Sequence, residues 1–223
     1  MTYLNEKEAI RRSLCKYTKE AFDMLPLIEK PRILDIGCGS GVPTLELAGL
    51  CSGHITGLDI DQVMLERLER KICEKVLQGR VRTLKCSLLD MDFPDESFDI
   101  IWAEGSISVI GFERGLKEWR RFIKINGFLV VHDDLGDLAK KLQLATDSGY
   151  EVLDYFILNE DIWWDEYYAP LEKIITQRRA EYAGNPEILS EFKSDEVEID
   201  MYKKDPARFR SVFFIMKKNP NGG

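Results

Sequence analysis

The stretch Ile33-Leu34-Asp35-Ile36-Gly37-Cys38-Gly39-Ser40-Gly41 decides the fold of this 223-residue chain. Its first four, mostly apolar residues predict a short buried strand, and three alternate glycines follow at once. Glycine has no Cβ and adopts positive φ, so this turn is tight and its backbone can lie against a ligand. Residues 42–50 are predicted as a helix, so the loop leads from a strand tip into a helix N-terminus. An α/β sheet builds a nucleotide-type site at such a point.

A second strand is predicted at residues 54–59, and it ends in Asp59, which follows the glycine loop by a strand-plus-helix length. An acidic residue at this place can accept hydrogen bonds from both hydroxyls of a ribose. A dinucleotide site needs Gly-x-Gly-x-x-Gly, but the sixth position here is Val42. The carboxylate of Asp35, two residues before the loop, would repel a pyrophosphate and would suit an ammonium group. The pattern therefore favours S-adenosylmethionine over NAD.

The segment 35–41 together with Asp59 resembles the cofactor signature of class I S-adenosylmethionine-dependent methyltransferases. The similarity continues through Phe93-Pro94-Asp95-Glu96-Ser97-Phe98-Asp99-Ile100-Ile101, which looks like the family's fourth strand with its lead-in. Asn126-Gly127-Phe128-Leu129-Val130-Val131 looks like the fifth strand with the preceding turn. The resemblance spans roughly residues 30–135, the cofactor half of that fold.

The resemblance implies a set of cofactor contacts near the carboxyl ends of the first four strands. Family members often carry an aspartate near the end of the third strand that contacts the adenine amino group. The position that aligns with it here is Ser87, so Ser87 or the Leu88 backbone would replace that contact. The implied cofactor-binding residues are Asp35, Gly37, Cys38, Gly39, Gly41, Asp59, Ile60, Ser87, Leu88, Ala103 and Glu104.

Two residues at the same edge are candidates for catalysis. Ligands of open α/β sheets sit outside the carboxyl ends of the strands, which selects Glu104 after strand four and His132 after strand five. A carboxylate in a partly dry cleft has a raised pKa and can serve as a base or attract a cationic acceptor. The alternative is structural, with Glu104 capping the next segment or pairing with an Arg or Lys. His132 is a candidate for acid–base work.

Two further clusters each have a functional and a structural interpretation. His132-Asp133-Asp134 could form a proton shuttle or part of a divalent-metal site. The structural alternative, which we favour, makes Asp134 the N-cap of the next helix and leaves Asp133 solvated, with no metal. The aromatic and acidic residues of 161–170 could cover a substrate or attract a cation. Alternatively, their rings pack a helix onto the sheet.

The whole chain is predicted to be one methyltransferase domain with a Rossmann-like α/β fold. Strands are expected near 32–36, 54–59, 80–86, 98–103, 127–132, 150–158 and 210–217, with helices near 42–50, 61–78, 112–125 and 136–148. The sheet would be seven-stranded and mostly parallel, with helices on both faces and an antiparallel last strand. The expected organisation is a helical lead-in over 1–30, a cofactor-binding half over 31–135, and a substrate-side half over 136–218 with a helical insertion at 160–204.

Charge and composition argue against a nucleic-acid substrate and against a membrane-spanning protein. The net charge is −8, the pI is near 5.0, and the lysines alternate with acids, so the basic footprint of a nucleic-acid enzyme is lacking. Residues 103–106 read Ala-Glu-Gly-Ser rather than the Asn/Asp-Pro-Pro-aromatic signature of nucleic-acid amino methylation. No apolar run approaches the roughly 20 residues of a membrane span, and five scattered cysteines suggest a reducing cytoplasm.

The function expected from these residues is methyl transfer from S-adenosylmethionine to a small molecule. Acids at 104, 133, 134 and within 161–168 would share one cleft, so the acceptor should be neutral or cationic. Two alternatives stay open: a non-catalytic S-adenosylmethionine-binding module, and a nucleotide-dependent enzyme on a similar sheet. The sequence leaves open the acceptor, the attacked atom type, and whether the protein is a monomer or a homodimer.

Overall fold

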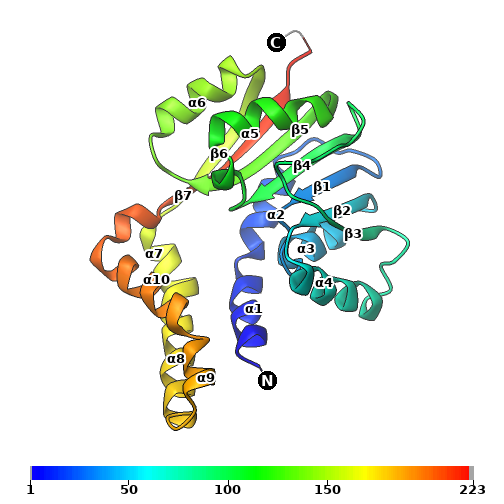
Figure 1. Ribbon diagram of the computed structural model, residues 1–223. Coiled ribbons are helices and arrows are strands. Elements are labelled where there is room, and N and C mark those ends of the chain that lie inside the picture. Colours follow the sequence, from blue (N-terminus) through cyan, green and yellow to red (C-terminus); the bar gives the residue numbers. More distant parts are fainter. Residues whose placement is uncertain (1, 221–223) are drawn as a thin grey trace. The chain divides into compact units, whose positions relative to one another are not determined.

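A computed structural model describes residues 2–220 and contains a seven-stranded sheet of order β3-β2-β1-β4-β5-β7-β6 (Figure 1). Strands β1 to β5 pair in parallel, and the last strand is antiparallel. The predicted Rossmann-like sheet is confirmed. The strands are β1 Arg32–Ile36, β2 His54–Asp59, β3 Val81–Lys85, β4 Phe98–Glu104, β5 Ile123–Asp134, β6 Tyr150–Leu158 and β7 Ser211–Lys218.

The helices connect these strands as parallel βαβ units require. In Figure 1, α2, α3 and α4 lie on one face of the sheet, and α5 and α6 lie on the other. Several α-helices also fill the predicted insertion between β6 and β7. The α-helices are α1 Tyr3–Ser13, α2 Cys15–Asp23, α3 Val42–Leu50, α4 Gln62–Glu74, α5 Phe112–Trp119, α6 Leu138–Asp147, α7 Glu160–Trp163, α8 Ala169–Glu181, α9 Pro186–Ser190 and α10 Lys193–Lys204.

The predicted helix at 112–125 is too long. The helix α5 ends at Trp119, a 3₁₀ turn covers Arg120–Phe122, and β5 begins at Ile123, four residues before the predicted strand. Ile123 is fully buried and pairs with Phe98 at the start of β4. Pairing between strands far apart in sequence therefore overrides the local helical pattern of this segment.

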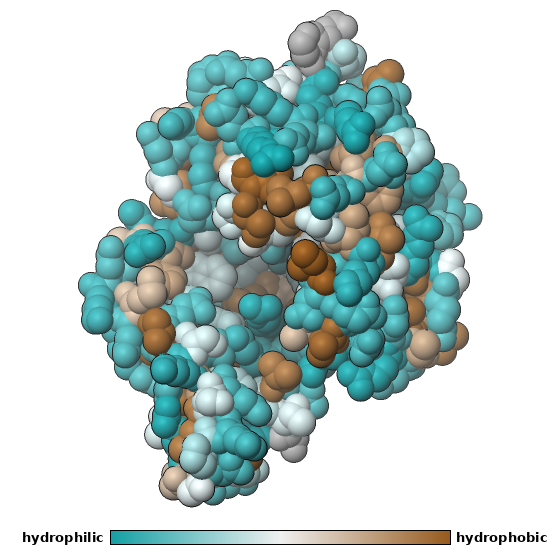
Figure 2. All heavy atoms as spheres, viewed as in Figure 1, coloured by the Kyte–Doolittle hydropathy of each residue, from teal (hydrophilic) through white to brown (hydrophobic). Residues whose placement is uncertain are grey.

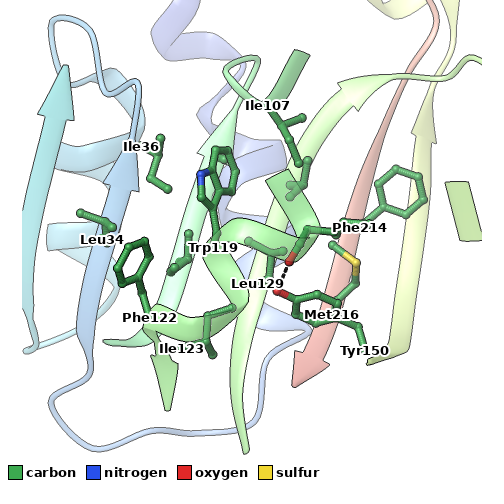
Figure 3. Packing of buried hydrophobic residues seen from close by; sticks show 14 of the residues in the cluster. Leu34, Ile36, Ile107, Trp119, Phe122, Ile123, Leu129, Tyr150, Phe214 and Met216 are labelled. Carbon is green, nitrogen blue, oxygen red and sulfur yellow. Dashed lines mark hydrogen bonds between the residues drawn. The ribbon is translucent and has the colours of Figure 1, made fainter. Parts of the chain in front are cut away.

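The main apolar core lies between the sheet and the helices α5 and α6. Figure 3 shows Trp119, Phe122 and Ile123 packed beside Leu34 and Leu129 of the sheet. At the other end of this cluster, the Tyr150 hydroxyl donates to the Leu116 carbonyl at 3.0 Å. This packing fixes the strand tips on which the candidate site depends.

The chain divides into two compact units. One consists of the chain through Leu14 together with Ile157–Ser211, and the other consists of Cys15–Phe156 with the chain from Val212 onward. The second unit holds nearly all of the sheet. The prediction of one domain for the whole chain stays a prediction.

The first unit has its own apolar core, built from α1 and the helices of the insertion. A π-helix at Trp164–Tyr168 precedes α8, whose second residue, Pro170, has no N–H to donate to the preceding turn. The buried apolar residues of this core are Tyr3, Ile10, Tyr167, Tyr168, Leu171, Ile175, Phe192, Ile199 and Tyr202.

The surface in Figure 2 is mostly hydrophilic, with apolar residues gathered in a few small patches. Ile60 and Val63 at the start of α4 and Val109 after β4 are among the exposed apolar residues. Within residues 2–220, no helix is long and apolar enough to cross a membrane.

Candidate active site

The glycine loop after β1 is tightly packed on both sides and open in the middle. All three glycines have positive φ: +73° at Gly37, +52° at Gly39 and +81° at Gly41. A Cβ at Gly37 would lie 2.5 Å from Ser106 Cβ, and a Cβ at Gly41 would lie 2.2 Å from Leu68 Cδ1. A Cβ at Gly39 would meet no atom within 4 Å. The space above Gly39 is therefore the point where a ligand can approach the backbone.

The backbone N–H groups of this loop are largely engaged within the protein. Gly37 and Cys38 both donate to the Leu58 carbonyl, at 2.8 and 3.0 Å. The Gly39 N–H donates to Asp59, and the Gly41 N–H donates to the Cys38 carbonyl. A phosphate site at a helix N-terminus depends on unpaired N–H groups. These four N–H groups are therefore not available to a pyrophosphate.

Asp59 at the end of β2 is linked directly to the loop. Its Oδ2 accepts from Gly39 N at 2.7 Å, and its Oδ1 accepts from Asp61 N at 2.9 Å. Each carboxylate oxygen has a second lone-pair direction for another donor. The neighbouring Ile60 side chain is 68% exposed. An acceptor pair and an exposed apolar side chain therefore stand beside the open position at Gly39.

Asp35 lies inside β1, beneath the loop, and is 1% exposed. Its Oδ2 accepts from the Thr44 hydroxyl at 2.5 Å. Burial raises the pKa of Asp35 to about 7, with Thr44 opposing the rise and Glu104 and Asp59 adding to it. No ion pair to Asp35 occurs among residues 2–220. Asp35 thus has a neutral donor, Thr44, and no basic partner in the described part of the chain.

Glu104 at the end of β4 is held by two neutral donors. Thr18 Oγ1 of α2 donates at 2.8 Å and Trp102 Nε1 donates at 2.7 Å, both to Oε1. Burial raises the pKa of Glu104 to about 7, although both hydrogen bonds act in the opposite direction. The structural alternative, pairing with an Arg or Lys, has no counterpart in the described part of the chain. Oε2 stays available to a further donor.

His132 of β5 lies opposite Glu104 in the register of β4 and β5. Its ring stacks on Phe213 at 4.3 Å, and Phe213 in turn stacks on Phe156 at 5.0 Å. Burial lowers the pKa of His132 to about 4. The imidazole is therefore neutral near pH 7, so it can accept a proton in a transient step but does not carry one at rest.

The expectations for Asp133 and Asp134 are wrong. Asp133 is buried rather than solvated, and it forms an ion pair with Lys141 of α6 at 2.6 Å. Burial raises the pKa of Asp133, and Lys141 opposes that rise. The N-cap of α6 is Asp137, not Asp134, which is the last residue of β5. Side chains alternate along a strand, so Asp133 faces α6 and not the face of His132 and Glu104.

The remaining predicted cofactor residues have more limited roles. Ala103 is buried in the core beneath α5, so only its backbone lies at the sheet edge. Cys38 is buried, its thiol pKa is raised by burial, and its sulfur would lie 3.0 Å from a Cβ at Gly57. The Ser87 hydroxyl accepts from Leu89 N at 3.1 Å and keeps its proton for another acceptor. Leu88 packs against the main core.

The aromatic residues at 163–168 contribute to packing of the first unit. Tyr167 and Tyr168 are buried in its core, and Trp164 stacks on Tyr202 at 5.4 Å. Trp163 Nε1 donates to Ser211 Oγ at 3.0 Å. These rings thus pack among the helices of their own unit, where the structural interpretation expected packing of a helix onto the sheet.

Several residues that position the site from a distance carry little or no signal in the sequence. Thr18 gave no signal because it lies 86 residues before Glu104 on a lead-in helix. Thr44, by contrast, could have been found from the sequence. It lies nine residues after Asp35 on the helix that follows the loop, from which a hydroxyl can reach back to the strand. Ser106 and Leu68 determine which glycines tolerate a side chain, and only the three-dimensional packing reveals them.

The fold is that of an α/β protein, and its candidate ligand site lies at the carboxyl ends of β1, β2 and β4, where such sheets bind ligands. Residues 33–127 match the methyltransferase-domain family. The 27-O-demethylrifamycin SV methyltransferase of Amycolatopsis mediterranei is 30% identical over 103 residues, which cover 46% of this chain and 38% of that protein. The sterol 24-C-methyltransferase erg-4 of Neurospora crassa is 32% identical over 103 residues, which cover 46% of this chain and 27% of that protein.

The solved structures agree in fold across nearly the whole chain. The [4+2]-cyclase SpnF gives a TM-score of 0.75 at 21% identity, over 92% of this chain and 81% of that one. A putative sarcosine dimethylglycine methyltransferase from Galdieria sulphuraria gives 0.73 at 18% identity, over 97% and 86%. The chain is thus similar to methyltransferase domains over residues 33–127, and it shares the fold of these solved structures. It spans less than half the length of the curated relatives it matches.

Proposed function

We propose that this protein transfers the methyl group of S-adenosylmethionine to a small-molecule acceptor that is neutral or cationic. The observation that carries the proposal is the open position at Gly39, with the Asp59 carboxylate 2.7 Å from its N–H. The residues fit this cofactor because the loop offers a bare backbone at Gly39, and because four of its N–H groups are already bonded within the protein. The same features weigh against a dinucleotide enzyme.

When bound, the cofactor supplies an electrophilic methyl carbon and a cationic sulfonium, so the protein must mainly align the reactants and exclude water. Asp59 would hold the ribose hydroxyls, and the exposed Ile60 would cover the adenine. Asp35 and Glu104 supply negative charge on one face of the sheet. Glu104, with a pKa of about 7, would also accept a proton from an acceptor near neutral pH.

The preference for a neutral or cationic acceptor depends on Asp35 and Glu104 rather than on Asp133. Lys141 neutralises Asp133, so that residue adds nothing to the field at the site. The other two carboxylates have no basic partner among residues 2–220. They would attract cations and repel carboxylates and phosphates. Sterol and rifamycin methylation are activities of relatives and do not identify the acceptor here.

The cofactor assignment is tested by calorimetry with S-adenosylhomocysteine. Asp59→Ala should lose roughly 1.5–3 kcal/mol of binding free energy, about ten- to a hundredfold in affinity. Asp92→Ala, which removes an exposed carboxylate elsewhere, is the matched control. Unchanged affinity in a folded Asp59→Ala variant would refute the assignment.

Methyl transfer needs a separate test, since a relative in fold is named a cyclase. Labelled methyl from S-adenosylmethionine should appear in a product when the protein is screened against pools of neutral and amine-containing small molecules. Tight S-adenosylhomocysteine binding without transfer to any pool would favour the alternative of a non-catalytic binding module.

A further inference from the structure

A hollow lies at the amino ends of the strands, at the opposite edge of the sheet from the glycine loop. Its volume is about 250 Å³, and it is formed where β1, β2, β3 and β4 begin. All residues that line it belong to the unit that contains the glycine loop. Its polar and aromatic lining includes Arg32, His54, Gln78, Arg80, Arg82 and Phe98.

This lining is basic in a chain whose net charge is −8. Three arginines and a histidine border the hollow, and no Asp or Glu is among the lining residues. Within residues 2–220, none of the three arginines forms an ion pair with a carboxylate. Asp99, next to Phe98, accepts from the Arg32 backbone N–H and pairs instead with Lys124.

The guanidinium groups of Arg82 and Arg32 each have a contact within the protein and keep N–H donors that are not used by it. Arg82 Nε donates to Thr56 Oγ1 at 3.0 Å, which leaves its two terminal nitrogens for another acceptor. The Arg32 guanidinium lies over the Phe98 ring, with its central carbon 5.8 Å from the ring centroid. Both groups are thus oriented and retain hydrogen-bonding capacity.

Arg80 differs from the other two because its role is structural. Its terminal nitrogens donate to the carbonyls of Ala48, Cys51 and Gly53, at 3.0, 2.9 and 3.3 Å. These bonds join the last turn of α3 and the loop after it to the residue that precedes β3. Arg80 therefore adds positive charge to the hollow without offering many free donors.

We propose that this hollow binds a small phosphate-type dianion or polyanion, of which pyrophosphate is the representative. Guanidinium groups bind phosphate oxygens in a bidentate manner, and Arg82 keeps the two terminal nitrogens this requires. Typical drug-sized sites occupy roughly 300–1,000 Å³, so this hollow suits a compact anion and not a whole nucleotide. The site is independent of the cofactor site, which lies at the carboxyl ends of the strands.

The test is titration calorimetry of the full-length protein with pyrophosphate at constant ionic strength, with inorganic phosphate and ADP as comparison ligands. Pyrophosphate should bind saturably at one site, more tightly than phosphate. Arg82→Gln and Arg32→Gln should each weaken this binding at least tenfold. Arg70→Gln, on the exposed surface of α4 and outside the hollow, removes the same charge and should leave the affinity unchanged.

Equal weakening by Arg70→Gln would show that net charge and not the hollow controls binding, and would overturn the proposal. So would wild-type affinity in Arg82→Gln, or saturable binding of a long polyanion such as heparin but not of pyrophosphate. Tighter binding of ADP than of pyrophosphate would contradict the assignment of the hollow to a compact anion. S-adenosylhomocysteine should not compete with pyrophosphate for binding to the wild type or to any variant.

Discussion

Asp35→Asn should change the pH dependence of stability in a way that the burial of Asp35 determines. Its pKa is 3.8 as an unperturbed group and about 7 in the folded protein, because burial disfavours the charged form. A carboxyl group whose pKa is raised by folding stabilises the folded protein at pH values below its pKa in the unfolded chain. That contribution is lost as pH rises through the folded value.

The magnitude follows from the shift. About three pKa units correspond to about 4 kcal/mol of destabilisation at alkaline pH, at about 1.4 kcal/mol per unit. Between pH 4.5 and 8.5, the wild type should therefore lose about 3 kcal/mol more than the variant, which cannot ionise at this position. The cost of burying the Asn amide is present at both pH values, so it cancels in this comparison.

Urea unfolding of both proteins at pH 4.5 and 8.5 measures the effect. The quantity compared is the difference in unfolding free energy between wild type and variant at each pH. The Asn side chain keeps an oxygen for the Thr44 hydroxyl, so the variant should stay folded. Asp92→Asn, an exposed substitution, is the control and should show no such pH dependence. If the stability difference between Asp35→Asn and wild type is the same at both pH values, Asp35 ionises without a desolvation cost and the reasoning is refuted.

Three further predictions concern the loop, the edge and the end of α4. Gly39→Val should fold but bind S-adenosylhomocysteine at least a hundredfold more weakly, as measured by calorimetry. Gly41→Val should instead lose about 2–5 kcal/mol of stability in urea unfolding, because its side chain would clash with Leu68. Glu104→Gln should lower methyl transfer at least tenfold at pH 8 with cofactor affinity within threefold, and normal transfer would remove Glu104 from the mechanism. Val76→Gly should raise the unfolding free energy by about 1 kcal/mol, since the β-branched Val76 has φ +55° after the end of α4; an unchanged urea midpoint would contradict this strain.

The sequence predicted the strands well because their signals are local. Apolar runs bounded by glycine and proline gave β1, β2 and β6 with the observed bounds. The end of α5 was misplaced because Ile123 joins the sheet through Phe98, a partner far away in sequence. Pairing of this kind is decided by the whole sheet and not by the residues around one helix end.

The candidate site was predictable in its backbone and less so in its side-chain environment. The loop, Asp35 and Asp59 follow from one short pattern. The surroundings of Glu104 depend on Thr18 in the lead-in helix, and those of Asp133 depend on Lys141 of the following helix. Sequence alone could not decide which carboxylate would be neutralised, because that depends on which face of the strand each one occupies.

The buried carboxylates fall into two kinds, one compensated by an ion pair within the fold and one without a basic partner. Asp133 is buried but paired with Lys141 at 2.6 Å, so its charge is compensated within the fold. Asp35 and Glu104 are held only by neutral donors, and burial raises the pKa of each to about 7. Such groups lower the stability of the folded protein at neutral pH, and perturbed titratable groups of this kind cluster where a protein binds or reacts with a ligand. Their shared face, beneath and beside the open position at Gly39, is therefore where a cation should bind.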